Sequence, residues 1–130
     1  ENFYFRPDAG GLMISPADET PSEPCDAQPE ELDIAYAVEA FEQATTEKVR
    51  RVAHRWAGLR TFAPDRIPIA GPDPGEPAFF WLAGQGGYGI QTAPALGMAT
   101  AELMETADLP SMLHAEGVTA ADFTPARLLS

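Results

Sequence analysis

The sequence predicts an α+β fold, in which a mostly antiparallel sheet is accompanied by two main helices. Three observations lead to this prediction. The chain opens with a hairpin pattern, apolar residues recur at helical spacing over residues 30–45, and a short apolar run precedes a second helical stretch at 92–106. With 130 residues, of which 45% are apolar, the chain is long enough for about one domain with a modest core.

Residues 2–15 are predicted to form the hairpin. Phe3 and Phe5 alternate with polar residues, which places the two rings on one face of a strand. The sequence "PDAGG" at 7–11 supplies turn residues before the second strand, "LMIS". A polar, proline-rich loop is expected over residues 16–29.

Residues 30–45 are predicted to form the first main helix. Apolar or semi-polar residues recur at steps of four and three: Ile34, Val38, Phe41 and Thr45. Asp26 or Gln28 is the expected N-cap, and Pro29 suits the first turn. Acidic residues near the start of this segment also favour a helix N-terminus, because the helix dipole is positive there.

Residues 47–71 are predicted to be extended, because Gly58, Pro64 and Pro68 punctuate them. The part over 47–62 is expected to form a strand in the same sheet as the hairpin. The first main helix should then pack on one face of that sheet.

The last third of the chain begins with a predicted short buried strand at 79–83. A helix over 92–106 follows, with Thr92 as the expected N-cap and Pro94 near its first turn. Residues 109–130 are predicted to be an irregular tail.

The charge distribution limits the classes of partner. The net charge is −12 and the pI is near 4.3, which argues against nucleic acid and anionic membranes. Residues 7–47 hold eleven acidic residues and no Lys or Arg, whereas residues 48–60 hold five of the eight basic ones. We interpret the two segments as a solvated acidic surface beside a strand with a basic outer face.

Other composition features predict where the protein resides and what it lacks. Cys25 is the single cysteine, so we expect no intrachain disulfide and a reducing, cytoplasmic location. No apolar run approaches the length of a membrane span. His54 and His114 have no further ligands nearby in the sequence, so no metal site is predicted.

The glycine-rich stretch "AGQGGYGI" at 83–90 contains Gly84-x-Gly86-x-x-Gly89, the pattern of a dinucleotide-binding fingerprint. That fingerprint also needs a second parallel strand after the helix, and "TADLPSMLHAEGVTAADF" contains no run typical of a strand. Two explanations of the glycines remain open. They let the backbone approach a flat ligand such as a flavin, with the helix N-terminus aimed at it, or they form a tight strand-to-helix turn without a ligand.

Two longer motifs then carry a family resemblance. The stretches "RWAGLRTFAPDRIPIAGPDP" and "FFWLAGQGGYGIQTAPALG", with the hairpin and the closing "FTPARLL", closely resemble the C-terminal part of FAD-dependent amino-acid oxidoreductases. This superfamily includes D-amino-acid oxidase, glycine oxidase and sarcosine oxidase. The resemblance implies a fragment of a two-domain enzyme. Residues 1–70 would be part of the substrate-binding domain, and 71–130 would return to the FAD-binding domain.

The start of the chain agrees with that expectation, because the sequence opens inside a strand pattern and has no initial Met. We therefore expect an N-terminal FAD-binding half to be missing here. The remnant of a protease-site tag is an alternative origin for the first residues.

The resemblance also implies roles for single residues. Arg60, in "GLR", corresponds to the arginine that pairs with the substrate carboxylate, although a surface salt bridge is its alternative role. The residues expected to run along the flavin are Gly84, Gly86, Gly87, Tyr88, Gly89, Ile90 and Gln91. Tyr4 and Tyr88 are further candidates for substrate contact, with core packing as the alternative for both.

Two positions depart from relatives. Tyr88 stands where some relatives carry His, and Gln91 stands where sarcosine oxidases carry a Lys tied to oxygen activation. The Gln91 departure favours a dehydrogenase over a fast oxidase. In either case the resemblance implies hydride transfer from a small amino acid or amine to FAD, which leaves an imine.

The chain alone is expected to be inactive and to lose FAD. Exposed apolar residues, with Phe79, Phe80, Ile90 and Leu96 as candidates, predict that isolated copies dimerise. The alternative function is a stand-alone interaction module, or one subunit of a split flavoenzyme.

Overall fold

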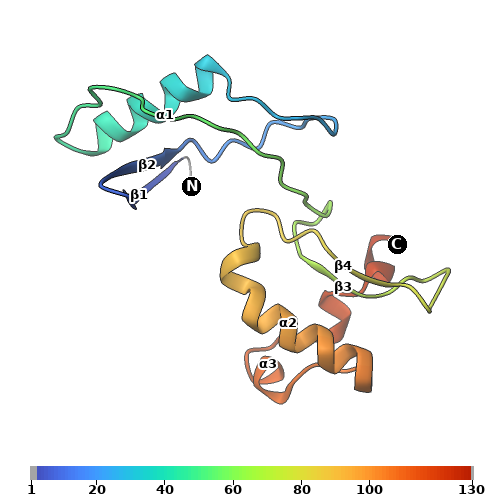
Figure 1. Cartoon of the computed structure of the whole chain (residues 1–130). Coiled ribbons are helices and arrows are strands. Elements are labelled where there is room, and N and C mark those ends of the chain that lie inside the picture. The colour runs from blue at the N-terminus through green and yellow to red at the C-terminus, as the bar shows by residue number, and fades with distance from the viewer. Residues whose placement is uncertain (1–2, 130) are drawn as a thin grey trace. The chain divides into compact units, whose positions relative to one another are not determined.

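A computed structural model describes residues 3–129, and the chain divides into two compact units, Glu1–Leu59 and Arg60–Ser130 (Figure 1). The predicted α+β class is confirmed, since the described residues form two antiparallel two-stranded sheets and three α-helices. Each unit contains one of the sheets. The assignment of residues 1–70 to a substrate-binding domain and of 71–130 to a segment that returns to the FAD-binding domain stays a prediction.

The first unit begins with the predicted hairpin. Strand β1 (Tyr4–Asp8) pairs with β2 (Gly11–Ser15), and the last pair of the register is Asp8 with Gly11. Ala9 and Gly10 both have positive φ, of 45° and 80°. Such a two-residue turn matches the twist of the strands that it joins. Position 2, where the hairpin was expected to begin, lies outside the described residues.

Helix α1 (Glu31–Ala44) packs against β2 and confirms the first predicted helix. Phe41 is only 2% exposed, and its ring meets that of Phe5 edge to face at 5.1 Å between centroids. Ala37, one turn earlier, is also buried. One face of α1 and one face of the hairpin therefore form the small core of this unit.

The predicted cap of α1 is wrong. Neither Asp26 nor Gln28 caps the helix, because the N-cap position is Glu30, with φ −86° and ψ 142° and no side-chain hydrogen bond. Gln28 instead donates from its amide to the Asp26 carbonyl at 3.3 Å. Pro29 and Glu30 keep the chain extended up to the first helical residue, which leaves both candidates too far back to reach the helix N–H groups.

The strand predicted over 47–62 is also wrong. Within the described part of the chain, this stretch contains no strand and makes only an isolated bridge at Phe62. Side chains hold it to α1 instead: Lys48 Nζ and the Val49 N–H both bond Glu42 at 2.9 Å. A strand is stable when a neighbour satisfies its backbone groups, and the hairpin does not pair with this segment.

The second unit is built on a sheet of β3 (Ile69–Pro72) and β4 (Phe80–Ala83), which confirms the strand predicted at 79–83. Helix α2 (Gly89–Thr106) packs against β3. The buried hydrophobic residues described in this unit are Ala63, Ala70, Leu96, Ala99 and Leu109. Most of them are small, so the sheet and the helix approach closely over a thin core.

Helix α2 begins three residues earlier than predicted. Tyr88 is the N-cap, and Thr92 lies inside the helix, where its hydroxyl donates to the Tyr88 carbonyl at 2.8 Å. Pro94 consequently sits within the helix rather than at its first turn. The early start matters for the site, because it places the helix N-terminus directly at the glycine-rich stretch.

The tail is more regular than predicted. Residues after α2 form a short helix α3 (Ser111–Ala115) and two 3₁₀ turns, η1 (Ala120–Asp122) and η2 (Pro125–Leu129). Among the described residues no strand follows α2, which is the feature that the dinucleotide-binding pattern lacked in the sequence. The Ala70 N–H donates to the Phe123 carbonyl at 3.0 Å and ties the tail to β3.

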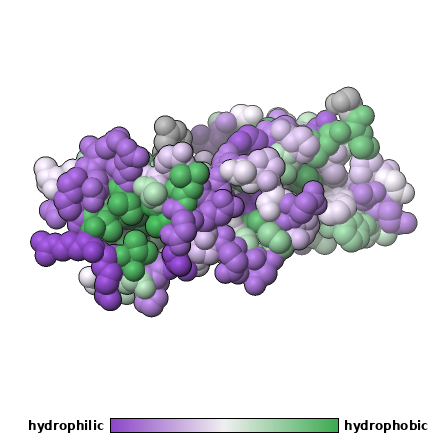
Figure 2. Space-filling view, turned by 90° about the horizontal axis from the view of Figure 1, so that it is seen from above, coloured by the Kyte–Doolittle hydropathy of each residue, from purple (hydrophilic) through white to green (hydrophobic). Residues whose placement is uncertain are grey.

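Apolar side chains reach the surface in both units, and the face in Figure 2 shows them among hydrophilic ones. Phe79 and Ile90 are exposed as predicted, and Ile90 reaches 95% exposure. Phe80 is only partly exposed. Leu96 corrects the prediction, since it is 8% exposed and belongs to the core between α2 and the sheet.

Candidate functional site

The glycine-rich stretch forms a tight turn between β4 and α2, which we call the glycine turn (residues 84–89). Gly84 has φ of 70° and Gly86 has φ of 55°, a left-handed conformation that side chains with a Cβ rarely adopt. At Gly84 a Cβ would also lie 3.3 Å from the backbone nitrogen of Ala63. The chain therefore needs glycine at both positions in order to leave the strand and enter the helix.

The segment before β3 lies directly against this turn. The Gly86 N–H donates to the Thr61 carbonyl at 2.9 Å, and Phe62 forms a bridge with Gln85. The ring of Phe62 fills the space beside Gly86 so closely that a Cβ there would come within 2.4 Å of it. The absence of a side chain at position 86 is thus required by a contact within the chain as well as by the backbone conformation.

Arg60 lies at the same turn. A Cβ at Gly87 would be only 2.8 Å from Arg60 Nη1, so the guanidinium rests against the bare backbone of that glycine. Arg60 also lies over the Phe62 ring, 5.5 Å from its centroid, and Arg66 lies 4.8 Å from the same centroid. The structure therefore brings together the arginine and the glycines that the sequence analysis singled out separately.

The N-terminus of α2 adds unused hydrogen-bond donors to this cluster. Within residues 3–129, the backbone N–H groups of Gly89, Ile90 and Gln91 have no acceptor. These are the donors that the first turn of any helix leaves free, and the helix dipole makes this end positive. Together with Arg60 they form a positively polarised surface that suits an anionic or electron-rich group.

The side chains along the turn point largely to solvent. Tyr88 is 61% exposed, and Gln91 is exposed as well. Gly89 opens the helix, where a Cβ would lie 3.3 Å from that of Gln85. Tyr4, the remaining candidate, is exposed on β1 in the first unit. The functional roles of these residues stay predictions.

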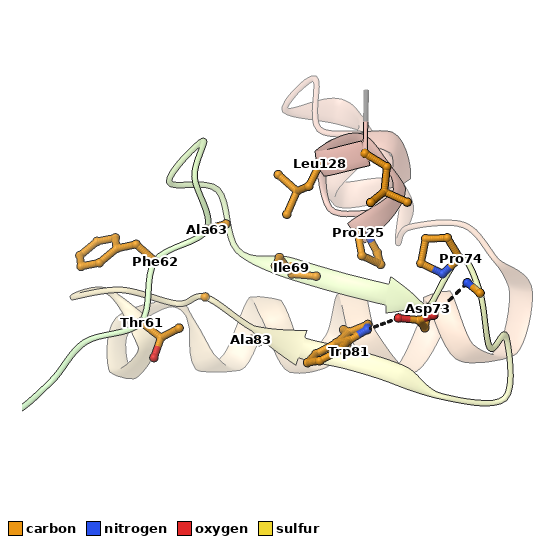
Figure 3. Close-up of a pocket in the computed structure, with 13 residues that line it drawn as sticks. Thr61, Phe62, Ala63, Ile69, Asp73, Pro74, Trp81, Ala83, Pro125 and Leu128 are labelled. Atoms are coloured by element: carbon orange, nitrogen blue, oxygen red, sulfur yellow. Dashed lines mark hydrogen bonds between the residues drawn. The ribbon is translucent and has the colours of Figure 1, made fainter. Parts of the chain in front are cut away.

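An open pocket of about 510 Å³ lies beside the glycine turn (Figure 3). Its floor is the sheet, with Ile69 and Trp81 among its lining, and η2 contributes Pro125 and Leu128 at one side. Thr61, Phe62 and Gly84 line the end nearest the turn. The pocket is mostly apolar, so it suits a flat or aliphatic group better than an ion.

Asp73 is the one ionisable side chain of this pocket within the described residues, and its environment fixes it. Its carboxylate accepts hydrogen bonds from Trp81 Nε1 at 2.9 Å and from the N–H groups of Gly75 and Glu76. These bonds, with that from Trp81 as the largest cause, lower the pKa of Asp73 below its ordinary value. A carboxylate so engaged stabilises the turn after β3 and is a poor general base.

Neither histidine belongs to the glycine turn. His114 Nε2 bonds Asp108 Oδ1 at 2.9 Å beyond the end of α2, and His54 is exposed in the first unit. In the part of the chain that the structure describes, no cluster of His, Cys, Asp or Glu is suited to hold a metal ion. None of the helices described combines the length and the apolar character needed to cross a bilayer.

Sequence reasoning missed Phe62 and Arg66 as neighbours of the glycine turn. A local signal for Arg66 exists, since Pro64 and Asp65 are typical turn residues and a turn there brings Arg66 back towards Phe62. Nothing local signals the contact of Phe62 with Gly86, because it joins residues that are distant in sequence.

Comparison with known families shows a match to this chain. Residues 1–103 match the model of a family described as FAD dependent oxidoreductase. The matched stretch contains Arg60, the whole glycine turn and most of α2.

Proposed function

This chain belongs to the family of FAD-dependent oxidoreductases, and from that premise we propose that its protein oxidises a small amino acid or a secondary amine. One observation carries the proposal: the guanidinium of Arg60 lies against Gly87, at the turn that precedes α2. A carboxylate bound by Arg60 would therefore lie beside the surface proposed for the flavin. The residues proposed for that surface are Gly84, Gly86, Gly87, Tyr88, Gly89, Ile90 and Gln91.

The residues of the glycine turn fit a flavin ring. The free N–H groups of Gly89, Ile90 and Gln91 are donors that match the ring's carbonyl oxygens, and the positive end of the helix dipole favours negative charge there. FAD, when bound, supplies the two-electron oxidising power for the reaction.

The role proposed for Arg60 is to bind and orient the substrate. Arg60 is exposed, and its planar guanidinium can give two parallel hydrogen bonds to a carboxylate while keeping its charge. This grip aims the Cα–H of the substrate at the flavin surface. The hydride leaves Cα with both electrons of its bond and the nitrogen loses a proton, so that a C=N bond forms in the product. Orientation of this kind supplies several kcal/mol to catalysis.

The proposed electron acceptor of the reduced enzyme is a partner other than oxygen. Gln91 is a neutral residue next to the free donors of α2. The sarcosine oxidases that this sequence resembles carry a cation at the corresponding position. We therefore propose a dehydrogenase that passes electrons to another acceptor.

We also propose that a separate FAD-binding half completes the site. The division of labour would be substrate binding by residues 1–70 and contact with the FAD-binding domain by 71–130. The exposure of Ile90 in the first turn of α2 and of Phe79 just before β4 supports this arrangement, since both would be covered by a neighbouring domain. A second copy of the chain is the alternative cover, and it would make the isolated piece dimeric.

The test uses the full-length protein that carries this chain. We expect it to purify with a flavin that absorbs at about 450 nm and to oxidise at least one member of a panel of D-amino acids, glycine, sarcosine and proline. Reduction of a dye should be faster than consumption of oxygen. Absence of flavin would favour the alternative of an interaction module.

A matched pair of variants isolates the role of Arg60. Arg60→Ala should lower kcat/KM by about 100-fold, because two charge-assisted hydrogen bonds to the carboxylate are lost. Arg51→Ala removes the same side chain from an exposed position in the first unit and should change kcat/KM by less than about 2-fold. Equal effects of the two substitutions would refute the proposed role of Arg60.

A further inference from the structure

A single arginine near the end of the chain fastens the segment that carries Arg60. Arg127, in η2, is only 13% exposed, and it lies outside the residues that match the family. Its Nε donates to Asp65 Oδ2 at 2.6 Å and its Nη2 to Asp65 Oδ1 at 3.1 Å. This is the two-pronged geometry that gives a guanidinium and a carboxylate their strongest and most directional pairing.

The same guanidinium also bonds backbone carbonyls on both sides of the pair. Nη2 donates to Ile67 at 2.7 Å and to Pro68 at 3.4 Å, and Nη1 donates to Phe123 at 2.8 Å and to Thr124 at 3.0 Å. The four bonds to Asp65, Ile67 and Pro68 join the tail to the 63–68 turn, and the two to Phe123 and Thr124 fix the guanidinium within the tail itself. A lysine could not reproduce this set, because its ammonium is a single point with three donors.

The turn that Arg127 holds is an unusual one. Arg66 has φ of 65°, a conformation that costs a residue with a side chain of order 1 kcal/mol. Asp65 Oδ1 accepts the Ile67 N–H at 3.1 Å, and the Arg66 N–H donates to the Ala63 carbonyl at 2.9 Å. The carboxylate of Asp65 thus stabilises the turn from inside while Arg127 clamps it from outside.

The 63–68 turn directly follows residues 60–62, which contact the glycine turn. Phe62 fills the space beside Gly86, and its ring centroid lies 5.5 Å from the guanidinium of Arg60 and 4.8 Å from that of Arg66. The segment 60–68 is therefore fixed at two points. One is the pairing with the glycine turn, and the other is the clamp by Arg127.

We propose that Arg127 is a positioning residue: by clamping the 63–68 turn, it sets where Arg60 and Phe62 lie against the glycine turn and so determines carboxylate affinity. The inference rests on the proposed role of Arg60 and extends it to a residue more than sixty positions away. Arg127 itself touches neither substrate nor flavin in this proposal.

A purely electrostatic effect is the competing explanation. Removing Arg127 would leave the negative charge of Asp65 without its partner, and that charge alone would weaken carboxylate binding. The two explanations differ in a double variant. In Arg127→Ala with Asp65→Asn the charge is gone but the clamp is still absent, so the loss persists only if position matters.

The experiment measures ligand binding to the full-length flavoprotein. The probe is benzoate, a carboxylate that has no oxidisable Cα–H, and benzamide serves as its uncharged counterpart; each is titrated by the change in the visible flavin spectrum. Arg127→Ala should weaken benzoate by about ten-fold and benzamide by less than about 2-fold, because a small displacement of Arg60 breaks its paired hydrogen bonds. Arg51→Ala, the charge-matched control, should change neither.

Two further variants decide the mechanism. Arg127→Lys and the double variant should both retain most of the ten-fold loss, since neither restores the clamp. Recovery of benzoate affinity in either one would overturn the positioning role. If Arg127→Ala fails to retain flavin, Asp65→Asn replaces it in the same assay, because it removes the paired bonds and leaves the four carbonyl bonds in place.

The same titrations separate this inference from the proposed function. Arg60→Ala should abolish the preference for benzoate over benzamide. If it does so while Arg127→Ala and Asp65→Asn leave the preference intact, the positioning role is wrong and the proposed function stands. If Arg60→Ala leaves the preference intact, the carboxylate anchor itself is wrong.

Discussion

Each of the two units contains an extended segment without a strand partner along most of its length, and the two segments are held in different ways. In the first unit, residues 45–59 attach to α1 through side chains, chiefly Lys48 with Glu42 and Arg55 with Glu31, and both basic residues are exposed. In the second unit, residues 60–68 are held by backbone pairing with the glycine turn and by the largely buried Arg127. Exposed ion pairs contribute little to stability, whereas partly buried, two-pronged ones are directional.

The difference indicates where a binding site can be precise. The first segment carries charge, but the contacts that hold it are weakened by water and salt. We therefore expect its position relative to α1 to be weakly fixed. The second carries Arg60 and Phe62 and is fixed at both ends. A ligand-orienting side chain needs rigid support, and only the second segment has it. The predictions below test this contrast in order of decreasing effect.

The largest effect is expected from the core of the first unit. Phe41→Ala should destabilise α1 by about 3–5 kcal/mol, because it removes a buried ring and its contact with Phe5. Hydrogen exchange measured by mass spectrometry should show the loss in peptides from α1 and the hairpin. Tyr36→Ala, on the exposed face of the same helix, is the control and should change stability by about 0.5 kcal/mol or less. Equal losses in the two variants would contradict the described core.

The glycine turn should give the next largest effect. Gly86→Ala places a Cβ in a left-handed residue and against the Phe62 ring, which should cost about 2–3 kcal/mol. Gly97→Ala is the matched control, since a Cβ there meets nothing and the helix interior favours Ala by about 0.5–1 kcal/mol. The two substitutions should therefore have opposite signs in the exchange of peptides from β4 and α2. The same sign for both would show that the turn accepts a side chain.

The contrast between the units also explains what the sequence could predict. Local patterns located the hairpin, both main helices and β4, because each depends on neighbouring residues such as Gly10 in the turn and Phe41 on the helix face. The prediction of a strand over 47–62 was wrong because an extended sequence pattern shows only that a segment could pair with another strand. Whether a partner strand lies beside it depends on the tertiary structure.

For the candidate site, too, the sequence predicted the local features and missed contacts between residues that are distant in sequence. The family motifs identified Arg60 and the glycines, and glycine spacing indicated a turn before a helix. The start of α2 was missed by three residues because Thr92 resembles an N-cap but bonds backward within the helix. The clamp by Arg127 joins residues more than sixty positions apart, and no local pattern of one sequence encodes it. Its partner Asp65 reads in isolation as an ordinary turn residue.

A smaller effect is expected from pH. The hydrogen bonds from Arg127, followed by that from the Ile67 N–H, lower the pKa of Asp65 below its ordinary value of 3.8. Its ionised form is therefore favoured by folding, so the stabilisation is complete above the ordinary value and is lost as the pH falls through the lowered one. Exchange of the 63–68 turn, corrected for intrinsic rates, should differ between wild type and Asp65→Asn at neutral pH. The difference should shrink as the pH falls below the ordinary value of 3.8. A difference that is constant over this range would mean that the Asp65 charge does not support the turn.

The smallest effect is expected from the exposed ion pair of the first unit. Arg55→Ala and Glu31→Gln should each change stability by about 0.5 kcal/mol or less, and their coupling in a double-mutant cycle should be no larger. Added salt should reduce even this coupling, because exposed charges are screened within about 10 Å at 0.1 M. The cycle is the sharpest test of the contrast between the units. A salt-resistant coupling above about 1.5 kcal/mol would place this pair beyond the range of exposed ion pairs. The first extended segment would then be as firmly held as the second. Rigid support would no longer explain why Arg60, the arginine at the glycine turn, belongs to the second segment.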